Sequence, residues 1–146
     1  MEIRQATVAD LDLIVPLFDA YRQFYRRPSD HEAARRFLLE RFKHNQSIVF
    51  LAFDGGEPAG FTQLYPGFSS GAMARILILN DLFVVPEGRG RGVGTALLRA
   101  AAEYGRLVGA LRLTLSTELS NATAQAVYEK MGWQRDTVFC NYQLTL

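Results

Sequence analysis

A glycine-rich turn constrains this chain more than any other segment. Residues 87–94 read Glu-Gly-Arg-Gly-Arg-Gly-Val-Gly, between the apolar run Ile76–Val85 and the helical pattern Thr95–Tyr104. Glycine has no Cβ, so its backbone can approach a ligand closely and adopt positive φ. The first N–H groups of a helix lack acceptors inside the helix, and the helix dipole is positive there. The segment therefore predicts a strand-to-helix turn that binds phosphate, with Arg89 and Arg91 adding forked donors.

Other phosphate-binding turns fit the residues less well. A Walker loop ends in Gly-Lys-Ser/Thr, and Gly94-Thr95 lacks the lysine. A dinucleotide fingerprint reads G-x-G-x-x-G, whereas these glycines alternate and Val93 stands where the third glycine would fall. Glu118, near the end of the next strand, could imitate a ribose-binding acid, so a Rossmann-type nucleotide-binding domain stays open as an alternative. The plainest alternative is a surface turn with solvated arginines, which four alternating glycines between a strand and a helix do not favour.

The arrangement Arg89-x-x-Gly92-x-Gly94 resembles the pyrophosphate loop of the GNAT superfamily of acyl-CoA-dependent N-acetyltransferases. In that family the loop reads Gln/Arg-x-x-Gly-x-Gly/Ala after a Val-x-Pro-like strand end, here residues 84–86. Residues 121–133 are similar to a second family signature, Asn-x-x-Ala-x-x-x-Tyr-x-x-x-Gly-Phe/Trp. The matching residues here are Asn121, Ala124, Tyr128, Gly132 and Trp133. The tail from Asp136 onward is similar to a subgroup related to yeast histone and polyamine acetyltransferases.

This resemblance implies an α+β fold with a GNAT-like mixed, mostly antiparallel central sheet and helices on both faces. The implied order is β-α-α-β-β-β-α-β-α-β-β. The implied cosubstrate is acetyl-CoA, whose pantetheine arm inserts beside the strand before the phosphate loop. The residues that match its binding positions are Leu82, Phe83, Val84, Arg89, Gly90, Arg91, Gly92, Val93, Gly94, Thr95, Asn121, Ala124 and Tyr128.

The resemblance also implies acetyl transfer to a primary amine, which requires a base and an acid. At pH 7 only about one alkylamine in a thousand is neutral, so a base must remove a proton. Asp81 best matches the family's carboxylate on the strand before the loop, and Glu118 is the alternative. Tyr128 matches the family tyrosine that protonates the departing thiolate. Three simpler roles stay open: a structural carboxylate at Asp81, a helix N-cap at Asn121 and a core aromatic at Tyr128.

Local patterns predict the individual elements. Strands are expected at 3–6, 47–53, 59–65, 76–85 and 111–115, with one or two more in 133–146. Residues 66–74 read as a loop. Capping boxes at Thr7–Asp10 and Ser29–Glu32 predict the starts of two helices, the first kinked or divided by Pro16. Further helices are expected from the phosphate turn to about Val108 and over residues 121–131, the last one ended by Gly132.

Composition sets outer limits on the chain. A chain of 146 residues that is 49% hydrophobic and 21% charged predicts one globular domain over 1–146, which the resemblance implies is an N-acetyltransferase domain. A net charge of +1 gives no support for a nucleic-acid partner. No signal peptide or membrane span is visible, and Cys140 is the only cysteine, so a cytoplasmic protein is expected. No metal site is predicted, and His31 and His44 are expected to be exposed.

The acceptor and the assembly are less defined. Aromatic residues of the N-terminal half could line a cleft for the amine, with Asp19 attracting its charge; they are Tyr21, Phe24, Tyr25, Phe61, Tyr65 and Phe68. The acceptor could be a small-molecule amine, a protein lysine or a protein N-terminus, and a non-catalytic acyl-CoA-binding module is a rival function. The apolar tail Val138–Leu146 predicts a homodimer, because a bare edge strand invites pairing with another chain.

Overall fold

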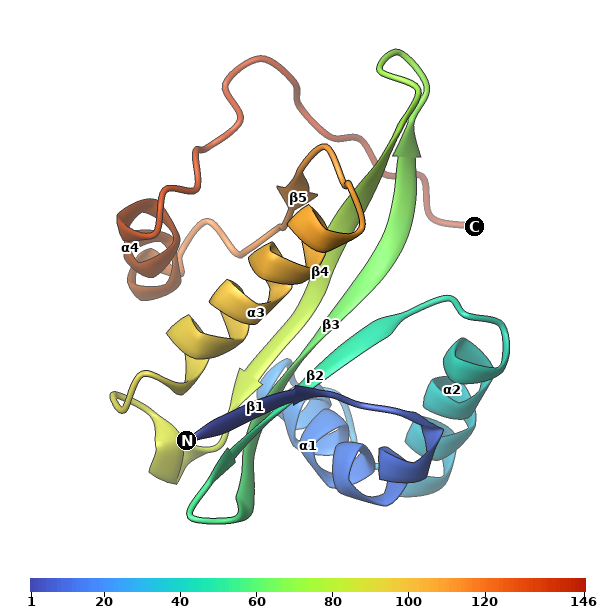
Figure 1. Ribbon diagram of the computed structural model, residues 1–146, viewed down its shortest axis with the longest axis vertical. Helices are drawn as coiled ribbons and strands as arrows, with labels where there is room; N and C mark the ends of the chain where they lie inside the picture. Colours follow the sequence, from blue (N-terminus) through green and yellow to red (C-terminus); the bar gives the residue numbers. More distant parts are fainter. The chain divides into compact units, whose positions relative to one another are not determined.

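The first of two compact units is built around a five-stranded sheet. The computed structural model describes residues 1–146. They form two compact units, residues 1–115 (unit 1) and residues 116–146 (unit 2). Unit 1 contains the strands in the order β1-β2-β3-β4-β5, as Figure 1 shows. All neighbours are antiparallel except β4 and β5, which are parallel. The strands are β1 (Glu2–Gln5), β2 (Ile48–Asp54), β3 (Glu57–Ser69), β4 (Ala74–Val84) and β5 (Leu113–Thr114). The predicted α+β fold with a mostly antiparallel sheet is confirmed.

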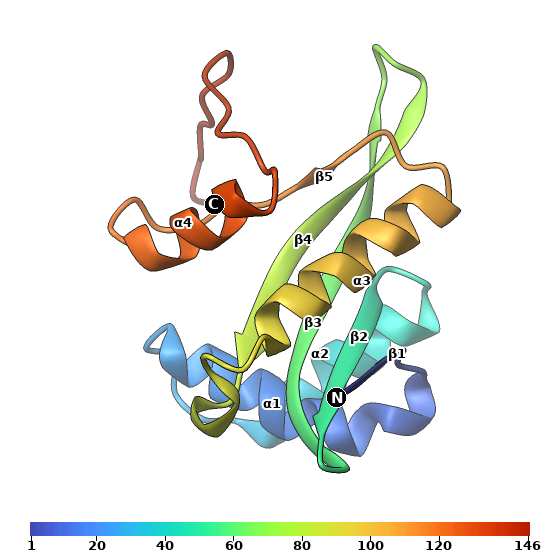
Figure 2. The same ribbon diagram turned by 60° about the vertical axis from the view of Figure 1, so that its left-hand side comes forward.

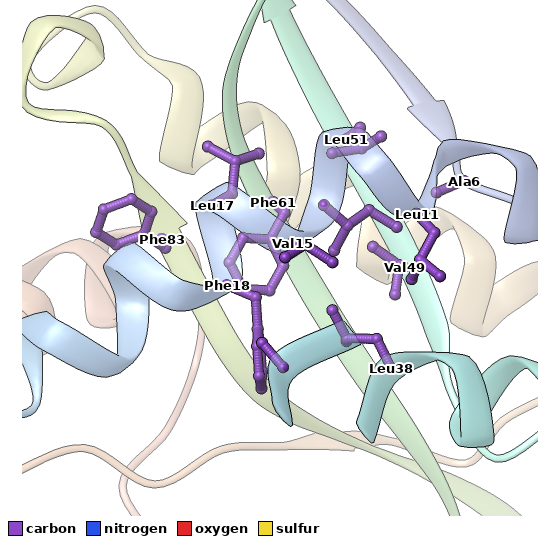
Figure 3. Packing of buried hydrophobic residues seen from close by; sticks show 12 residues of the cluster. Ala6, Leu11, Val15, Leu17, Phe18, Leu38, Val49, Leu51, Phe61 and Phe83 are labelled. Carbon is purple, nitrogen blue, oxygen red and sulfur yellow. The ribbon is translucent and has the colours of Figure 1, made fainter. Parts of the chain in front are cut away.

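Helices cover both faces of this sheet (Figure 2). One face carries α1 (Leu11–Phe24), which follows the short helix η1 (Val8–Asp10), and α2 (His31–Lys43). The other face carries α3 (Val93–Leu107), which follows the short helix η2 (Pro86–Gly88). Between the sheet and α1–α2 lies an apolar core whose side chains include Leu11, Val15, Phe18, Leu38, Val49, Leu51, Phe61 and Phe83 (Figure 3).

The predicted start of the first helical segment is confirmed in detail. Thr7 accepts the Ala9 N–H through its side chain, and Asp10 accepts the Thr7 N–H, which completes a capping box. Of the two effects predicted for Pro16, a division of the helix is wrong, since α1 runs unbroken from Leu11 to Phe24. Burial of one side of α1, including Ile14, Leu17 and Phe18, holds the helix together through the proline. The second helix begins one residue later than its predicted box, because Asp30 rather than Ser29 caps it.

The hairpin of β3 and β4 is longer than predicted and irregular. Residues expected to form a loop instead extend the ladder, with Pro66 opposite Leu77 and Ser69 opposite Ala74. The register shifts between Gln63 and Leu64, because Gln63 lies opposite Asp81 while Leu64 lies opposite Leu79. Asn80 is therefore the extra residue of a β-bulge, which changes the side of the sheet that the following residues face.

Unit 2 contains a single helix, α4 (Ala122–Lys130). Asn121 caps its start by accepting the Ala124 N–H at 3.2 Å. Its end is a Schellman motif: Gly132 has φ +93°, its N–H donates to Glu129, and the Trp133 N–H donates to Tyr128. The predicted N-cap and the predicted stop at Gly132 are both present.

The final strands predicted in residues 133–146 are wrong for this structure, which forms none there. Asp136 Oδ1 accepts the N–H groups of Val138 and Phe139 at 2.9 and 3.0 Å. These bonds offer the backbone an alternative to a sheet ladder. The apolar pattern of the tail was compatible with a strand, but a strand needs a partner edge, and the pattern alone does not supply one.

None of the helices has the length and the apolar character that crossing a membrane requires.

Candidate active site

A row of N–H donors lines the glycine-rich turn. The backbone N–H groups from Gly90 to Thr95 donate to no acceptor in the chain, and the first bond after them is from Ala96 to Gly92. Gly90 and Gly92 have φ of +75° and +83°, a region that glycine enters without strain. Gly92 is the N-cap of α3. Successive N–H groups at such a turn form an anion-binding concavity, with the helix dipole adding positive potential.

The space around the glycines differs from one to the next. A Cβ at Gly90 or Gly92 would meet no atom within 4 Å, and one at Gly94 would meet only Val84 Cγ2 at 3.7 Å. The backbone of this turn therefore faces open space rather than neighbouring side chains. That is the condition under which a bulky anion can reach the N–H groups.

The two arginines of the turn are engaged with the body of unit 1. Arg89 donates from Nε to the Val84 carbonyl at 3.2 Å, and its guanidinium lies 5.7 Å from the ring centre of Phe24 and 6.0 Å from that of Phe83. Arg91 forms a salt bridge of 3.1 Å with Asp54. Both arginines are exposed, so their charges still contribute to the potential around the turn.

The strand before the turn leaves one edge without a strand partner. On its inner side, Leu82, Phe83 and Val84 lie opposite Thr62, Phe61 and Gly60 of β3. On its outer side, β5 pairs with β4 only at Leu77 and Ile78. The backbone of residues 82–84 therefore lies in a stretch of β4 that β5 does not reach. An extended ligand could pair with this edge as an added strand would.

Asp81 is buried on the α1 side of the sheet. The bulge at Asn80 places Asp81 opposite Gln63 and turns it away from the side faced by Leu77. Only 2% of Asp81 is exposed. Gln63 Nε2 donates to Oδ2 at 2.6 Å and Asn80 Nδ2 donates to Oδ1 at 3.1 Å.

Burial and hydrogen bonds act on Asp81 in opposite directions. Burial raises the pKa of the Asp81 carboxyl because it disfavours the charged form. Hydrogen bonds from Gln63, Tyr21 and Asn80 offset part of this effect, and the pKa remains above its ordinary value. A carboxylate with a raised pKa is a better proton acceptor near neutral pH.

Two tyrosines complete the surroundings of Asp81. Tyr21 of α1 also donates from its hydroxyl to the Asn80 carbonyl at 3.4 Å, and the Tyr65 hydroxyl accepts from Gln63 Nε2 at 3.1 Å. Burial, together with the charge of Asp81, raises the pKa of both phenols above the ordinary value. Both tyrosines are therefore neutral hydroxyl groups over the physiological pH range.

Asn121, Ala124 and Tyr128 lie in unit 2 and are described there alone. Asn121 and the Ala124 N–H are engaged with each other in the N-cap. Tyr128 is half-buried, and its ring centre lies 6.0 Å from that of Trp133. The alternative base, Glu118, is exposed, and its carbonyl accepts the Asn121 N–H. Of the two candidate bases, Asp81 is therefore the buried one and Glu118 the exposed one.

The predicted aromatic cleft is only partly assembled. Tyr21, Phe24 and Tyr25 form a chain of ring contacts with centres 5.0 and 5.3 Å apart. Phe61 is fully buried in the core, and Phe68 is exposed on the hairpin beside Arg75.

Asp19 is not available to attract a cation, because it holds the segment between α1 and α2. It accepts from the Ser29 hydroxyl at 2.7 Å and the Asp30 N–H at 2.8 Å, and His31 lies 3.2 Å away. Burial disfavours the charged carboxylate, but these three groups together keep its pKa below the ordinary value.

Sequence reasoning missed Gln63. It is fully buried in β3 and contacts the candidate base directly. A signal was present, because a single amide in the apolar stretch Ala59–Tyr65 needs a buried partner. The partner was not predictable from the pattern, since the register of β3 and β4 depends on the bulge.

Comparisons with known proteins identify the family of the chain. The sequence model of the acetyltransferase (GNAT) family matches residues 14–133. An uncharacterized N-acetyltransferase of Bacillus subtilis strain 168, YhfO, is 49% identical over 146 residues, which are 100% of this chain and 98% of that protein. A crystal structure of a probable acetyltransferase is 42% identical, with a TM-score of 0.95 and coverage of 100% and 98%.

A more distant structure shows the same fold. The aminoglycoside N-acetyltransferase AAC(6')-Iy, solved in complex with CoA, is 21% identical, with a TM-score of 0.82 over 99% of this chain and 95% of that one. Fold, family match and full-length relatives lead to one conclusion: this chain is an acetyltransferase of the GNAT family.

Proposed function

We propose that the protein transfers an acetyl group from acetyl-CoA to a primary amine of a small molecule or of a protein lysine or N-terminus. The observation that carries the proposal is the row of N–H groups from Gly90 to Thr95, which has no acceptor in the chain. Pyrophosphate is a ligand of matching charge and chemistry for such a row. GNAT membership makes CoA its natural source.

The donor would lie along β4. Its pyrophosphate binds the N–H row, and its pantetheine arm runs beside residues 82–84, where β5 does not reach. Backbone groups there supply the hydrogen bonds of an added strand, and one N–H polarises the thioester carbonyl. In unit 2, Asn121 and Ala124 belong to the signature that contacts pantetheine in the family this chain resembles.

Asp81 is the proposed base. It takes a proton from the ammonium group, directly or through a water molecule, and the neutral nitrogen attacks the carbonyl carbon. The resulting oxyanion then collapses, the C–S bond breaks, and Tyr128 donates its proton to the thiolate. The nitrogen releases its second proton to water, and the Tyr128 phenolate takes a proton back from water. The raised pKa of Asp81 favours the first step.

A panel of amines tests the proposal. Polyamines, amino acids, aminoglycosides and lysine peptides would be incubated with acetyl-CoA, and released CoA would be followed with a thiol reagent. Cys140 is exposed and gives a constant background that a blank without amine removes. Mass spectrometry of each product should show one added acetyl group. CoA should also raise the thermal midpoint of the protein, whereas NAD and ATP should not. Failure of CoA to stabilise the protein would remove the basis of the proposal.

A further inference from the structure

Gln63 is the closest hydrogen-bond partner of Asp81. It lies on β3, directly opposite Asp81 at the bulge, and it is fully buried. Its Nε2 group donates one N–H to Asp81 Oδ2 at 2.6 Å and the other to the Tyr65 hydroxyl at 3.1 Å. Thr62, next to Gln63 on β3, donates from Oγ1 to the backbone carbonyl of Asp81 at 2.8 Å. This bond fixes the backbone of β4 at Asp81.

The other end of the same amide has no partner. Gln63 Oε1 is buried and accepts no hydrogen bond. A buried acceptor left without a donor costs free energy, so such an atom calls for a physical reason. An amide has a donor end and an acceptor end of nearly equal size, and a half-turn about its last bond exchanges them.

The two ends of this amide suit the two forms of Asp81. When the carboxylate is charged, Nε2 donates to Oδ2, as observed. When the carboxyl group is protonated, an N–H donor facing its O–H would be repelled. After a half-turn, Oε1 faces Asp81 and accepts that O–H. Oε1 therefore gains a partner in the protonated state, while the Nε2 group leaves Asp81 and Tyr65, so the turned amide returns once Asp81 has lost its proton.

We infer that Gln63 is a positioning residue that stabilises Asp81 in both protonation states through rotation of its side-chain amide. This inference rests on the proposed function, in which Asp81 is the base. In that step the amine N–H bond breaks, an O–H bond forms on Asp81, and the nitrogen keeps its electron pair for attack. Gln63 then turns and accepts the new O–H. Loss of that proton to water returns both groups to the starting state.

The other titratable groups around Asp81 do not replace Gln63. Tyr21 approaches from α1 and Tyr65 from β3, and both remain neutral while Asp81 titrates. Arg41 of α2 is the nearby cation and acts on Tyr65. Asn80 donates to the other carboxylate oxygen. Gln63 is thus the partner whose unmatched acceptor can serve protonated Asp81.

The test is the pH dependence of kcat/KM in Gln63→Met, measured with an amine from the panel. Methionine keeps the length of the side chain but can neither donate nor accept, so the charged form of Asp81 loses a charge-assisted hydrogen bond while the protonated form loses only a weaker neutral one. We expect the rising limb of the profile to move to higher pH by about one unit or more. A purely structural role for Gln63 would lower kcat/KM equally at every pH. Gln46→Met makes the same chemical change at an exposed position and should leave the profile in place.

A second measurement uses the wild-type protein and needs no substitution. Carbon-13 labelling of aspartate and nitrogen-15 labelling of glutamine allow both groups to be titrated by NMR. The side-chain amide signal of Gln63 should change with the same midpoint as the Asp81 carboxyl. An amide signal that does not follow Asp81, or an unmoved rising limb in folded Gln63→Met, would overturn the inference.

A different result would show that the proposed function, with Asp81 as the base, is wrong. If Asp81→Asn turns over like wild type, Asp81 is not the base and the proposed mechanism itself is wrong. If Asp81→Asn is inactive while Gln63→Met keeps the wild-type profile, only the role of Gln63 is lost.

Discussion

At the scale of single residues, Tyr128 carries the most specific chemical expectation. Its hydroxyl is proposed to protonate the thiolate that leaves when acetyl-CoA is cleaved. Tyr128→Phe should therefore lower kcat by about 10² or more, with a smaller effect on acetyl-CoA binding. Steady-state kinetics with a confirmed amine, together with calorimetry of acetyl-CoA binding, measure the two effects. Wild-type turnover in this variant would exclude the role.

Asp10 makes a testable contribution to stability. It binds Arg4 through two bonds of 2.8 and 2.9 Å and accepts the Thr7 N–H, and these contacts lower its pKa from 3.8 to about 2. A lowered folded-state pKa means that the stabilisation is present above pH 4 and is lost as the pH falls through about 2. Because Arg4 is partly exposed, the interaction is screened, and Asp10→Asn should cost about 1 kcal/mol at pH 7.

Urea unfolding of wild type and Asp10→Asn across the pH range checks this expectation. The difference between the two proteins should shrink steadily between pH 4 and pH 2. Asp12→Asn is the matched control, since Asp12 pairs with Arg35 in a more exposed salt bridge and should contribute less. An Asp10 effect that stays constant with pH would mean that the ion pair does not cause it.

At the scale of elements, the turn before α3 should bind CoA through its backbone. Gly94 is the best position for a test, because a Cβ there meets only Val84 at 3.7 Å and the backbone is not in the left-handed region. Gly94→Val should lower CoA affinity at least tenfold, about 1.4 kcal/mol, by placing bulk where the pyrophosphate approaches. Gly94→Ala is the control and should lose less. Unchanged affinity in folded Gly94→Val, measured by calorimetry, would argue against this binding mode.

Gly60, in the hairpin of β3 and β4, lies against the neighbouring backbone, unlike the glycines of the turn before α3. A Cβ at Gly60 would lie 2.5 Å from the Phe83 carbonyl oxygen, and neither backbone can yield without disturbing the ladder. Gly60→Ala should destabilise the protein by about 1–3 kcal/mol. Gly105→Ala is a matched comparison, since its Cβ would meet the mobile end of Leu113 at 2.7 Å and helix α3 gains about 1 kcal/mol from alanine. Thermal unfolding of both variants should rank Gly60→Ala clearly lower, and equal midpoints would contradict the steric argument.

The elements also show what a sequence can predict. Helix starts and stops were predictable at Thr7 and Gly132, because a cap depends on residues within one turn of each other. The strand-to-helix turn with its positive-φ glycines was predictable for the same reason. The bulge at Asn80 was not, since it depends on pairing between two strands, and neither was the Gln63–Asp81 contact that follows from it. The strands predicted in the tail were wrong for a related reason. The apolar pattern there is typical of a strand, but it does not show whether a partner edge is present.

At the scale of the whole molecule, the exposed tail leads us to propose that two copies associate. Val138, Phe139, Tyr142 and Leu144 are each at least 77% exposed, and α4 contains no buried residue. An apolar surface of this kind is typical of an interface. We expect light scattering at micromolar concentration to give the mass of two chains. A monomer mass would refute this expectation.

Charge substitution tests whether the tail forms the interface. Phe139→Asp combined with Leu144→Asp should shift the mass toward one chain, because charge is costly in an apolar contact. Leu107→Asp introduces the same group at another exposed apolar position and should leave the mass unchanged. A dimer that survives the double substitution would place the interface elsewhere.

The bulge at Asn80 has a consequence for how this chain can vary. If every residue of β4 were paired, Asp81 and Leu77 would face the same side of the sheet, so leaving Asn80 out of the pairing places the carboxylate with α1 rather than with α3. Replacement of Asn80 by another residue can keep that arrangement, and its deletion would remove the bulge while leaving Asp81 opposite Gln63, so that Asp81 and Phe83 would stay in the layer of α1. The layer in which the carboxylate lies is thus determined by its partner on β3: an alignment of relatives that retain the carboxylate can show a changed letter or a one-residue gap at this point, as long as the pairing with Gln63 is kept.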